Sequence, residues 1–478
     1  MIVIAIVIIY MLGMIGIGYY SSRKVSNNDD FMVAGRRLGP ILVAGTLAAT
    51  EIGGGSSLGV AEKSYTTWGI SASWYVITMG IAFVILSFIA HKFRGAEVKT
   101  VPEYFRRRYG KSSGLVTAII MMLPLIGLTA SQFIATSTVV TVMLGIDYRW
   151  AVTITAAVVT LYSVLGGMWS ITLTDFVQVI LIVLGMAIAI PFALGSTGGF
   201  SNMVANVPPE TFDMFKGISL PTIISLVIMY IASFTVGQEA VSRFYSARDG
   251  KTAIQGSVIA AVINFVYAFI PTILGIAALA LVNMGTLDAA VVGDQGGKFA
   301  MPILAMETMP PVIVGLLFSG IISATMSSAS SDLLGAGSIF GNDIYKQYIK
   351  KDASQDQVLK STRIVMALVG LLGWCVAFFN TGAIITLLMF SFSLRAAGAF
   401  FPYVFGLYWK KSSQTAAILS LIFGSAVVVY FQYFPVSIGS YQVDPILPGL
   451  IVGFVAFMLG CLIKPSLRQH CDLEPEEA

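Results

Sequence analysis

The sequence predicts an all-α membrane protein that crosses the bilayer many times. Its 478 residues are 56% hydrophobic and only 11% charged, whereas soluble domains carry roughly 25% charged residues. The mean hydropathy is +0.85. Apolar windows of about 19 to 20 residues, long enough to cross the hydrocarbon core, recur along the whole chain. The net charge of +4 is therefore expected to reflect membrane orientation and not nucleic-acid binding.

About thirteen segments are long and apolar enough to be transmembrane helices. They lie at 2–22, 41–62, 68–91, 114–145, 150–166, 171–195, 219–238, 252–283, 310–340, 361–380, 383–408, 414–433 and 445–463. The segments 114–145, 252–283 and 310–340 are too long for an upright helix, so we expect them to tilt or to extend beyond the bilayer. The first segment lacks a basic leader and a small-residue cleavage site, which favours a retained span over a signal peptide.

The basic residues give the orientation of these spans. Of the 28 Lys and Arg residues, 23 fall on one side if the N-terminus is outside, and Arg395 lies within a span. The other side keeps four, Lys63, Arg149, Lys216 and Lys298. Because basic residues are enriched in cytoplasmic loops, we expect a multi-pass plasma-membrane protein with an outside N-terminus and a cytoplasmic C-terminus.

The residues that enzymes use most often are scarce in this chain. Only His91 and His470 are present, and the three cysteines, Cys375, Cys461 and Cys471, follow no metal or disulfide pattern. The longest polar stretches, about 196–218 and 284–309, are too short for a catalytic domain. We therefore expect neither an enzyme nor a signalling domain, and we expect the segment 464–478 to be a cytoplasmic tail.

The segment from Ile41 to Val60 is the most informative one in the chain. It is apolar, yet it contains Glu51, the run Gly53-Gly54-Gly55 and two serines. A carboxylate at membrane depth is costly unless it faces a cavity or a partner, and an interrupted helix needs ligands for its freed carbonyls. Such breaks mark ion and substrate sites in transporters. The alternative is a close helix-packing face in which Glu51 pairs internally.

A serine-rich helix face is expected between Ser319 and Tyr345. Spacings of three and four residues stack side chains on one face, which groups Ala324, Ser327, Ser328 and Ser331 in one stripe. Hydroxyl and carbonyl oxygens are neutral ligands that suit a cation. The same serines would also suit helix packing within a membrane.

Three further charges lie in or beside apolar segments. Asp175 could cap a helix start or balance a cation. Glu239 follows Gly237 at the end of a span, where an ion pair with Arg243, four residues on, is favoured over a ligand role. Arg395 lies mid-span, fifteen residues from Lys410 or about 22 Å along a helix. It needs an anionic partner, which could be Glu51, another acid or a substrate carboxylate.

These motifs together resemble the sodium:solute symporter family, which includes proline, galactose, sialic acid, pantothenate and choline transporters. The resemblance rests on FMVAGRRLGP, AATEIGGG, LYSVLGGMWS, LTDFVQV, ATMSSASS with DIY behind it, and LYWKK, in that order. It implies a leucine-transporter-like fold with two inverted five-helix repeats. The implied division is an extra N-terminal helix and inner loop in 1–40, repeats in 41–195 and 219–408, and two C-terminal helices in 409–463.

The resemblance also implies ion sites. The main sodium site would use the carbonyls of Ala49, Ile52 and Ala324 and the hydroxyls of Ser327 and Ser328. A second sodium site, present in some members, would use Asp175, Ser330 and Ser331. Sodium is thus the expected ion, beside a small organic solute and membrane lipid as further partners. The oligomeric state stays open.

The solute is expected to bind next to the interrupted helix. Proline transporters have an acid where this chain has Glu51, but Arg395 has no counterpart in them. The two charges would suit the two ends of a zwitterion such as an amino acid, or they would pair with each other. The expected substrate-binding residues are Glu51, Gly53, Ser56, Trp74, Gln132, Phe234 and Arg395, with Tyr75 as a further candidate.

The sequence therefore predicts sodium-coupled uptake of an amino acid or another amine by alternating access. Sodium would join the interrupted helix to the serine helix and complete the solute pocket. The alternatives are sodium- or proton-coupled uptake of a carboxylate or of a quaternary amine such as choline. A membrane sensor of the solute, or a membrane enzyme, is a more remote alternative.

Overall fold

Helices make up nearly all of the computed structural model, which describes residues 1–22, 28–379, 384–439, 441–466 and 473. The helices of the N-terminal half are α1 Ile2–Ser22, α2 Asn28–Val33, α3 Pro40–Glu51, α4 Val60–Lys63, α5 Trp74–Ser87, α6 Ala90–Gly95, α7 Val101–Tyr109, α8 Lys111–Leu144, α9 Tyr148–Ala187, α10 Ala189–Ser196, α11 Phe200–Ala205 and α12 Leu220–Val236.

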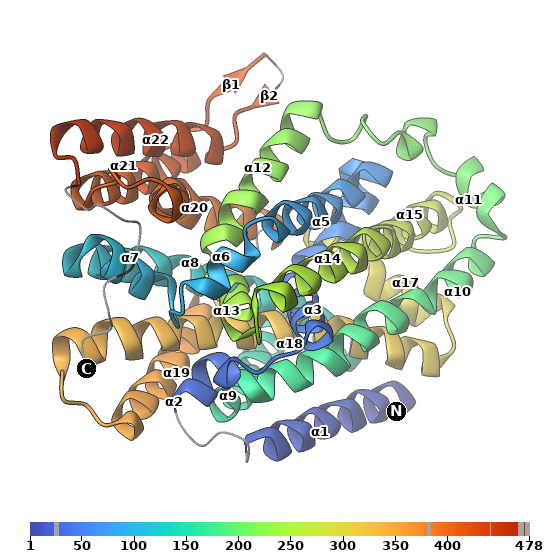
Figure 1. Cartoon of the computed structure of the whole chain (residues 1–478). Coiled ribbons are helices and arrows are strands. Elements are labelled where there is room, and N and C mark those ends of the chain that lie inside the picture. Colours follow the sequence, from blue (N-terminus) through green and yellow to red (C-terminus); the bar gives the residue numbers. More distant parts are fainter. Residues whose placement is uncertain (23–27, 380–383, 440, 467–472, 474–478) are drawn as a thin grey trace.

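The C-terminal half continues in the same manner. Its helices are α13 Gln238–Ser246, α14 Gly250–Tyr267, α15 Phe269–Asn283, α16 Ala289–Gly293, α17 Ala300–Thr308, α18 Pro311–Ile339, α19 Gln355–Phe379, α20 Ile384–Tyr408, α21 Gln414–Tyr433 and α22 Ile446–Ile463. Short π-helical turns occupy Gly55–Gly59, Ser64–Trp68 and Phe340–Ile349. A two-stranded hairpin, β1 Ser437–Ile438 with β2 Tyr441–Gln442, protrudes before α22 (Figure 1).

Local side chains explain where several helices begin. The Ser219 side chain accepts a hydrogen bond from the Thr222 amide at the start of α12, and Asp249 accepts one from Thr252 at the start of α14. These caps satisfy amides that have no partner within the helix. Pro40 and Pro311 stand in the first turns of α3 and α18, where a missing N–H costs nothing.

Two helices are interrupted in the middle of the protein. The first is α3, which ends at Glu51 before helical turns resume at Gly55. The second is the pair α12 and α13, which are bent by 55° at Gly237. One interruption lies near the beginning of each predicted repeat, 41–195 and 219–408. The division into these repeats stays a prediction.

Within the described residues, each of the about thirteen expected spans falls on helical segments, although fewer single helices pass a test of length and apolar composition. Among the described residues, ten helices are long and apolar enough to cross a membrane, or eleven if α12 with α13 counts as one bent span. The expected span 41–62 does not count because the interruption leaves α3 as a short apolar helix. The expected spans 150–166 and 171–195 both belong to α9, which bends at Gly167, where φ is 71°. The tail 464–478 lies almost wholly outside the described residues.

Helix α18 occupies the middle of the bundle and positions the site. It packs against α9, α8, α1 and α19, and α3 packs against α14 and α9. Helix α1 lies along one side of the bundle, and α20, α21 and α22 lie together at the opposite side (Figure 1). Of the ten candidate spans, the one that contains α18 is the most buried. Polar side chains on α18 therefore face protein and not lipid.

Candidate functional site

The interruption after α3 frees two backbone carbonyls. The Ile52 amide still donates to the Ala48 carbonyl at 2.8 Å, but the Gly53 amide donates to the Glu51 carbonyl at 3.0 Å. The Gly54 amide leaves the helix altogether and donates to Gln132 Oε1 on α8 at 2.7 Å. In a continuous helix these two amides would bond to the carbonyls of Ala49 and Thr50. Both carbonyls therefore need other partners.

Serine hydroxyls from α18 supply those partners. Ser327 Oγ lies 2.7 Å from the Ala49 carbonyl and 2.9 Å from the Ala324 carbonyl. Ser328 Oγ lies 2.7 Å from the Thr50 carbonyl and 3.1 Å from that of Ala324. Four of the five expected sodium ligands, all except Ile52, are thus joined by hydrogen bonds. Thr50 is a further oxygen that the sequence did not single out.

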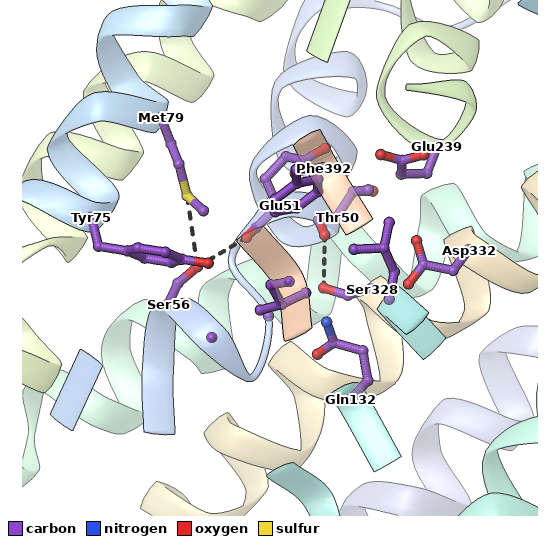
Figure 2. Close-up of a pocket in the computed structure, with 14 residues that line it drawn as sticks. Thr50, Glu51, Ser56, Tyr75, Met79, Gln132, Glu239, Ser328, Asp332 and Phe392 are labelled. Atoms are coloured by element: carbon purple, nitrogen blue, oxygen red, sulfur yellow. Dashed lines mark hydrogen bonds between the residues drawn. The ribbon is translucent and has the colours of Figure 1, made fainter. Parts of the chain in front are cut away.

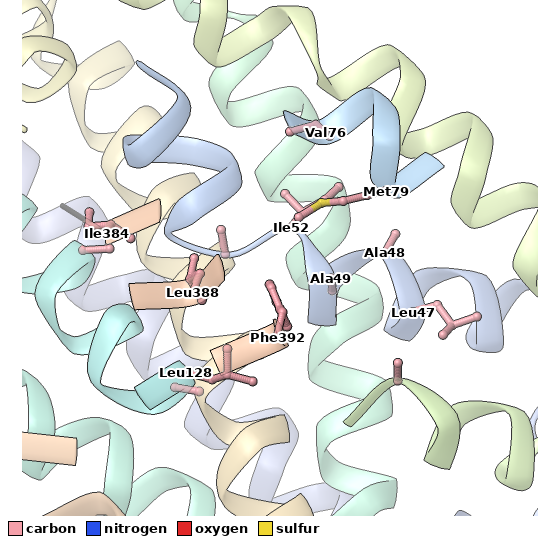
Figure 3. Close-up of a cluster of buried hydrophobic side chains, with 14 of the residues drawn as sticks. Leu47, Ala48, Ala49, Ile52, Val76, Met79, Leu128, Ile384, Leu388 and Phe392 are labelled. Atoms are coloured by element: carbon pink, nitrogen blue, oxygen red, sulfur yellow. The ribbon is translucent and has the colours of Figure 1, made fainter. Parts of the chain in front are cut away.

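The chemistry of this oxygen cluster suits a small cation. All of its atoms are neutral oxygens, and a hydroxyl can turn its proton away and present a lone pair. The apolar residues Leu47, Ile52, Met79, Leu128 and Phe392 surround the interruption (Figure 3). They keep bulk water away, so an ion bound there would exchange hydration for protein oxygens. The Ile52 side chain belongs to this apolar cluster.

Asp175 lies on α9 and is fully buried. Thr46 Oγ1 of α3 donates to Asp175 Oδ2 at 2.5 Å, and Arg243 Nη2 of α13 lies 3.6 Å from the same oxygen. The nearest break in α9 is eight residues earlier, at Gly167. Asp175 therefore does not cap a helix start. It balances a cation, and that cation is an arginine of the chain.

Arg243 connects Asp175 to the serine helix. Its Nη2 forms a short hydrogen bond to Ser331 Oγ, and its Nη1 donates to the Glu239 carbonyl at 2.6 Å. Asp175 and Ser331, two of the expected ligands of a second sodium ion, are therefore both in contact with one guanidinium group. The third, Ser330, donates to the Ser327 carbonyl of its own helix at 3.0 Å.

A small pocket opens beside the interruption. Its volume is about 20 Å³, and it receives residues from α3, the π-helical turn Gly55–Gly59, α5, α8, α13, α18 and α20 (Figure 2). The lining residues are Thr50, Glu51, Gly53, Gly55, Ser56, Tyr75, Met79, Leu128, Gln132, Glu239, Ser328, Asp332, Leu388 and Phe392. Five residues that the sequence proposed for the solute, Glu51, Gly53, Ser56, Tyr75 and Gln132, are among them.

Trp74, Phe234 and Arg395, which the sequence also proposed for the solute, are not part of this lining. Trp74 Nε1 donates to the Met214 carbonyl at 2.9 Å, which turns the indole toward the loop before α12. Phe234 is fully buried, with its ring centroid 5.3 Å from that of Phe83 and 5.1 Å from that of Tyr230. These two aromatic residues serve packing because their faces are already covered.

Arg395 forms an ion pair with another acid, Glu239. Its Nη1 donates to Glu239 Oε2 at 2.7 Å, its Nη2 lies 2.5 Å from Oε1, and its Nε donates to Ser233 Oγ at 2.8 Å. The two-point contact is a strong form of this interaction. The expected side-chain pair between Glu239 and Arg243 is wrong, because Arg243 points to Asp175 and meets Glu239 only at its carbonyl.

Asp332 is an acidic lining residue that the sequence did not single out. It follows Ser331 on α18, is 3% exposed and faces the pocket beside Glu239 and Ser328 (Figure 2). The signal was present, since an acid inside an apolar span is a functional candidate by the criterion that identified Glu51. Asp332 was passed over because the serines of the same segment drew attention to a sodium site.

Comparison with known proteins identifies the family. The model of the sodium:solute symporter family matches residues 31–424 of this chain. The chain belongs to this family. It is similar to the osmoregulated proline transporter OpuE of Bacillus subtilis, at 27% identity over 95% of this chain and 93% of that protein. The sodium/proline symporter of Salmonella typhimurium is 27% identical over 95% and 92% of the two chains.

Solved structures show the same fold. A sodium-coupled sialic acid symporter in a substrate-bound, outward-open state superposes with a TM-score of 0.80, at 22% identity over 98% of this chain and 99% of that one. The nucleobase-cation-symport-1 transporter Mhp1, closed around bromovinylhydantoin, gives a TM-score of 0.58 at 15% identity over 92% and 94%. The predicted leucine-transporter-like fold is confirmed. This symporter-family chain is a multi-pass membrane transporter and not an enzyme.

Proposed function

We propose that this symporter couples sodium entry to the uptake of a small organic solute that carries an amine. The observation that carries the proposal is Glu51, a buried carboxylate that lines the pocket and whose Oε1 has no hydrogen-bond partner among the described residues. An ammonium group would supply that partner. A solute with only a carboxylate would be repelled by the acids around it, so the carboxylate alternative is disfavoured.

The resemblance to proline transporters supports an amine. The named relatives OpuE and the Salmonella protein are proline symporters, and proline has a charged amine. At 27% identity this similarity does not extend to a particular solute. Gly53, Ser56, Tyr75 and Gln132 would shape the rest of the solute site, since they line the same pocket. Arg395 would act on the site through Glu239 and would not touch the solute.

Sodium is a transported substrate in this mechanism. The ion would bind between α3 and α18, to the carbonyls of Ala49, Ile52 and Ala324 and to the hydroxyls of Ser327 and Ser328. The hydrogen bonds of the two serines across this gap support the assignment. An ion that binds better when α3 and α18 are close would shift the protein toward that state. A second ion at Asp175, Ser330 and Ser331 would have to displace Arg243.

The direction of transport follows from the orientation proposed from the basic residues. With the N-terminus outside and the C-terminus in the cytoplasm, sodium would enter down its gradient. The membrane potential adds about 2.3 kcal/mol per charge per 100 mV. Sodium and solute would leave together on the inner side.

Uptake into proteoliposomes tests the proposal. We expect a panel of amino acids and amines to include a solute that accumulates with an inward sodium gradient and not when potassium replaces sodium. Ser327→Ala and Ser328→Ala should each raise the sodium concentration for half-maximal uptake about tenfold, or ~1.4 kcal/mol. Ser319→Ala is the matched control, since this buried serine lies on the same helix, outside both proposed ion sites, and its hydroxyl has no hydrogen-bond partner among the described residues.

Two results would contradict the proposal. Uptake driven by a pH gradient without sodium would assign coupling to protons. Unchanged sodium dependence in both Ser327→Ala and Ser328→Ala would reduce these serines to helix packing.

A further inference from the structure

Three carboxylates from three different helices surround the pocket. Glu51 comes from the end of α3, Glu239 from α13 and Asp332 from α18 (Figure 2). All three are buried, with exposed fractions of 6%, 2% and 3%. Acidic groups are thus concentrated where the solute would bind.

Among the described residues, Glu239 is the only one of these carboxylates that pairs with an arginine. Arg395 pairs with Glu239 through two close contacts. The other nearby arginine, Arg243, is directed at Asp175 and Ser331. Four carboxyl groups therefore face two guanidinium groups, which leaves Glu51 and Asp332 without an arginine partner among the described residues. Burying one unpaired charge already costs several kcal/mol.

A second observation indicates that this excess serves a ligand. Glu51 Oε1 is buried and lacks a hydrogen-bond partner among the described residues, and Glu51 lines the pocket. Buried polar atoms are normally satisfied. This unsatisfied carboxyl oxygen indicates a missing donor or cation that a bound solute would provide.

We propose that the solute is a small organic cation with one positive charge and no carboxylate, bound between Glu51 and Asp332. This inference rests on the proposed function and narrows its solute class. One sodium ion and one monovalent cation would balance Glu51 and Asp332 in their ionised forms, which bound cations stabilise. A zwitterionic amino acid with one sodium ion would leave one buried negative charge, and its carboxylate would face Asp332 or Glu239.

Two matched pairs of compounds test the solute class. Choline and glycine betaine share a trimethylammonium group, and L-prolinol and L-proline share a pyrrolidine ring. In each pair the first compound is an alcohol, so it carries only a positive charge. The second compound has a carboxylate in place of the alcohol and is therefore a zwitterion. Binding is measured as the concentration of each compound that gives half-maximal thermal stabilisation of the purified protein in sodium, with potassium as control.

The native protein should bind the cation of at least one pair about tenfold more tightly than its zwitterionic partner. Asp332→Asn removes one negative charge, so a zwitterion with one sodium ion then balances the site. In this variant the zwitterion of that pair should therefore bind more tightly than the cation. Glu51→Gln also replaces an acid by its amide, on the opposite wall of the pocket. It provides the same test if Asp332→Asn does not fold. Glu62→Gln is the control, because Glu62 is buried but does not line the pocket.

The outcomes separate this inference from the function on which it rests. Tighter binding of the zwitterions by the native protein, or an unchanged order in both pocket variants, would overturn the cationic class. Stabilisation by sodium without binding of any of the four compounds would overturn it as well. If sodium neither stabilises the protein nor promotes binding of any compound, the proposed sodium-coupled function itself fails.

Discussion

Arg395 and Glu239 form a buried ion pair within the membrane-spanning part of the chain. Their exposed fractions are 1% and 2%, so neither charge is hydrated well enough to stand alone. Such a pair is costly to assemble, yet the loss of one member costs more than the loss of both. Its role is to hold α12, α13 and α20 together and to keep Arg395 away from the solute.

A double-mutant cycle tests this pairing. Glu239→Gln and Arg395→Gln should each lower the free energy of unfolding by roughly 3–5 kcal/mol, because each leaves an uncompensated charge. The double variant should recover most of this loss. The control is Glu51→Gln with Arg395→Gln, which should show no recovery. If stability recovers in the double variant of Glu51 and Arg395, and not in that of Glu239 and Arg395, then Arg395 pairs with Glu51.

Arg243 occupies the region between Asp175 and Ser331, so it acts as a built-in cation there. We expect one sodium ion per solute in the native protein. Arg243→Gln would free Asp175 and Ser331 for an ion and should raise the ratio of charge to solute flux. Arg243→Lys keeps the charge and should preserve the native ratio. Two sodium ions per solute in the native protein would contradict this prediction.

The interrupted helix depends on close approach between two elements. An added Cβ at Gly54 would overlap the Cβ of Ala135 on α8, and one at Gly53 would lie 2.6 Å from Ser328 Oγ. These glycines let α3 meet α8 and α18 so closely that Gln132 can accept from the Gly54 amide. The interruption is therefore fixed by its neighbours as much as by its own flexibility.

A pair of substitutions on α8 and the interruption tests this element. Gly54→Ala should lower both stability and sodium-dependent uptake, because the new methyl group collides with Ala135. Adding Ala135→Gly should restore part of both, since it removes the overlapping atom. Ala135→Gly alone is the control for helix weakening, which costs about 1 kcal/mol. Absence of rescue in the double variant would argue that Gly54 matters for another reason, such as its backbone freedom.

At the scale of the whole molecule, the basic residues define one side of the membrane. The exposed loop residues Lys216 and Lys410 fall on opposite predicted sides. Single cysteines at these positions, in a background without Cys375, Cys461 and Cys471, report the orientation. A membrane-impermeant thiol reagent applied to intact cells should label Lys216→Cys and not Lys410→Cys. The reverse pattern would invert the proposed direction of uptake.

The sequence by itself determined the membrane class, most of the spans, the interruption at Glu51 and the serines that face it. Composition, apolar length and glycine runs are local properties, and their energetic consequences do not depend on distant residues. The motif order also gave the family and therefore the fold. The breaks and bends within these spans were not predicted, apart from the interruption at Glu51, because a hydropathy window does not register a change in helix direction.

Only the tertiary structure decided which charges meet. Arg395 lies 156 residues from Glu239 in the chain, and Arg243 lies 68 residues from Asp175. The rotation of each helix in the bundle selects the partner, and no local pattern encodes that rotation. The same reason explains why Trp74 and Phe234 left the predicted site and Asp332 entered it. The low dielectric of the buried region then makes each of these pairings decisive, because an unpaired charge there finds no water.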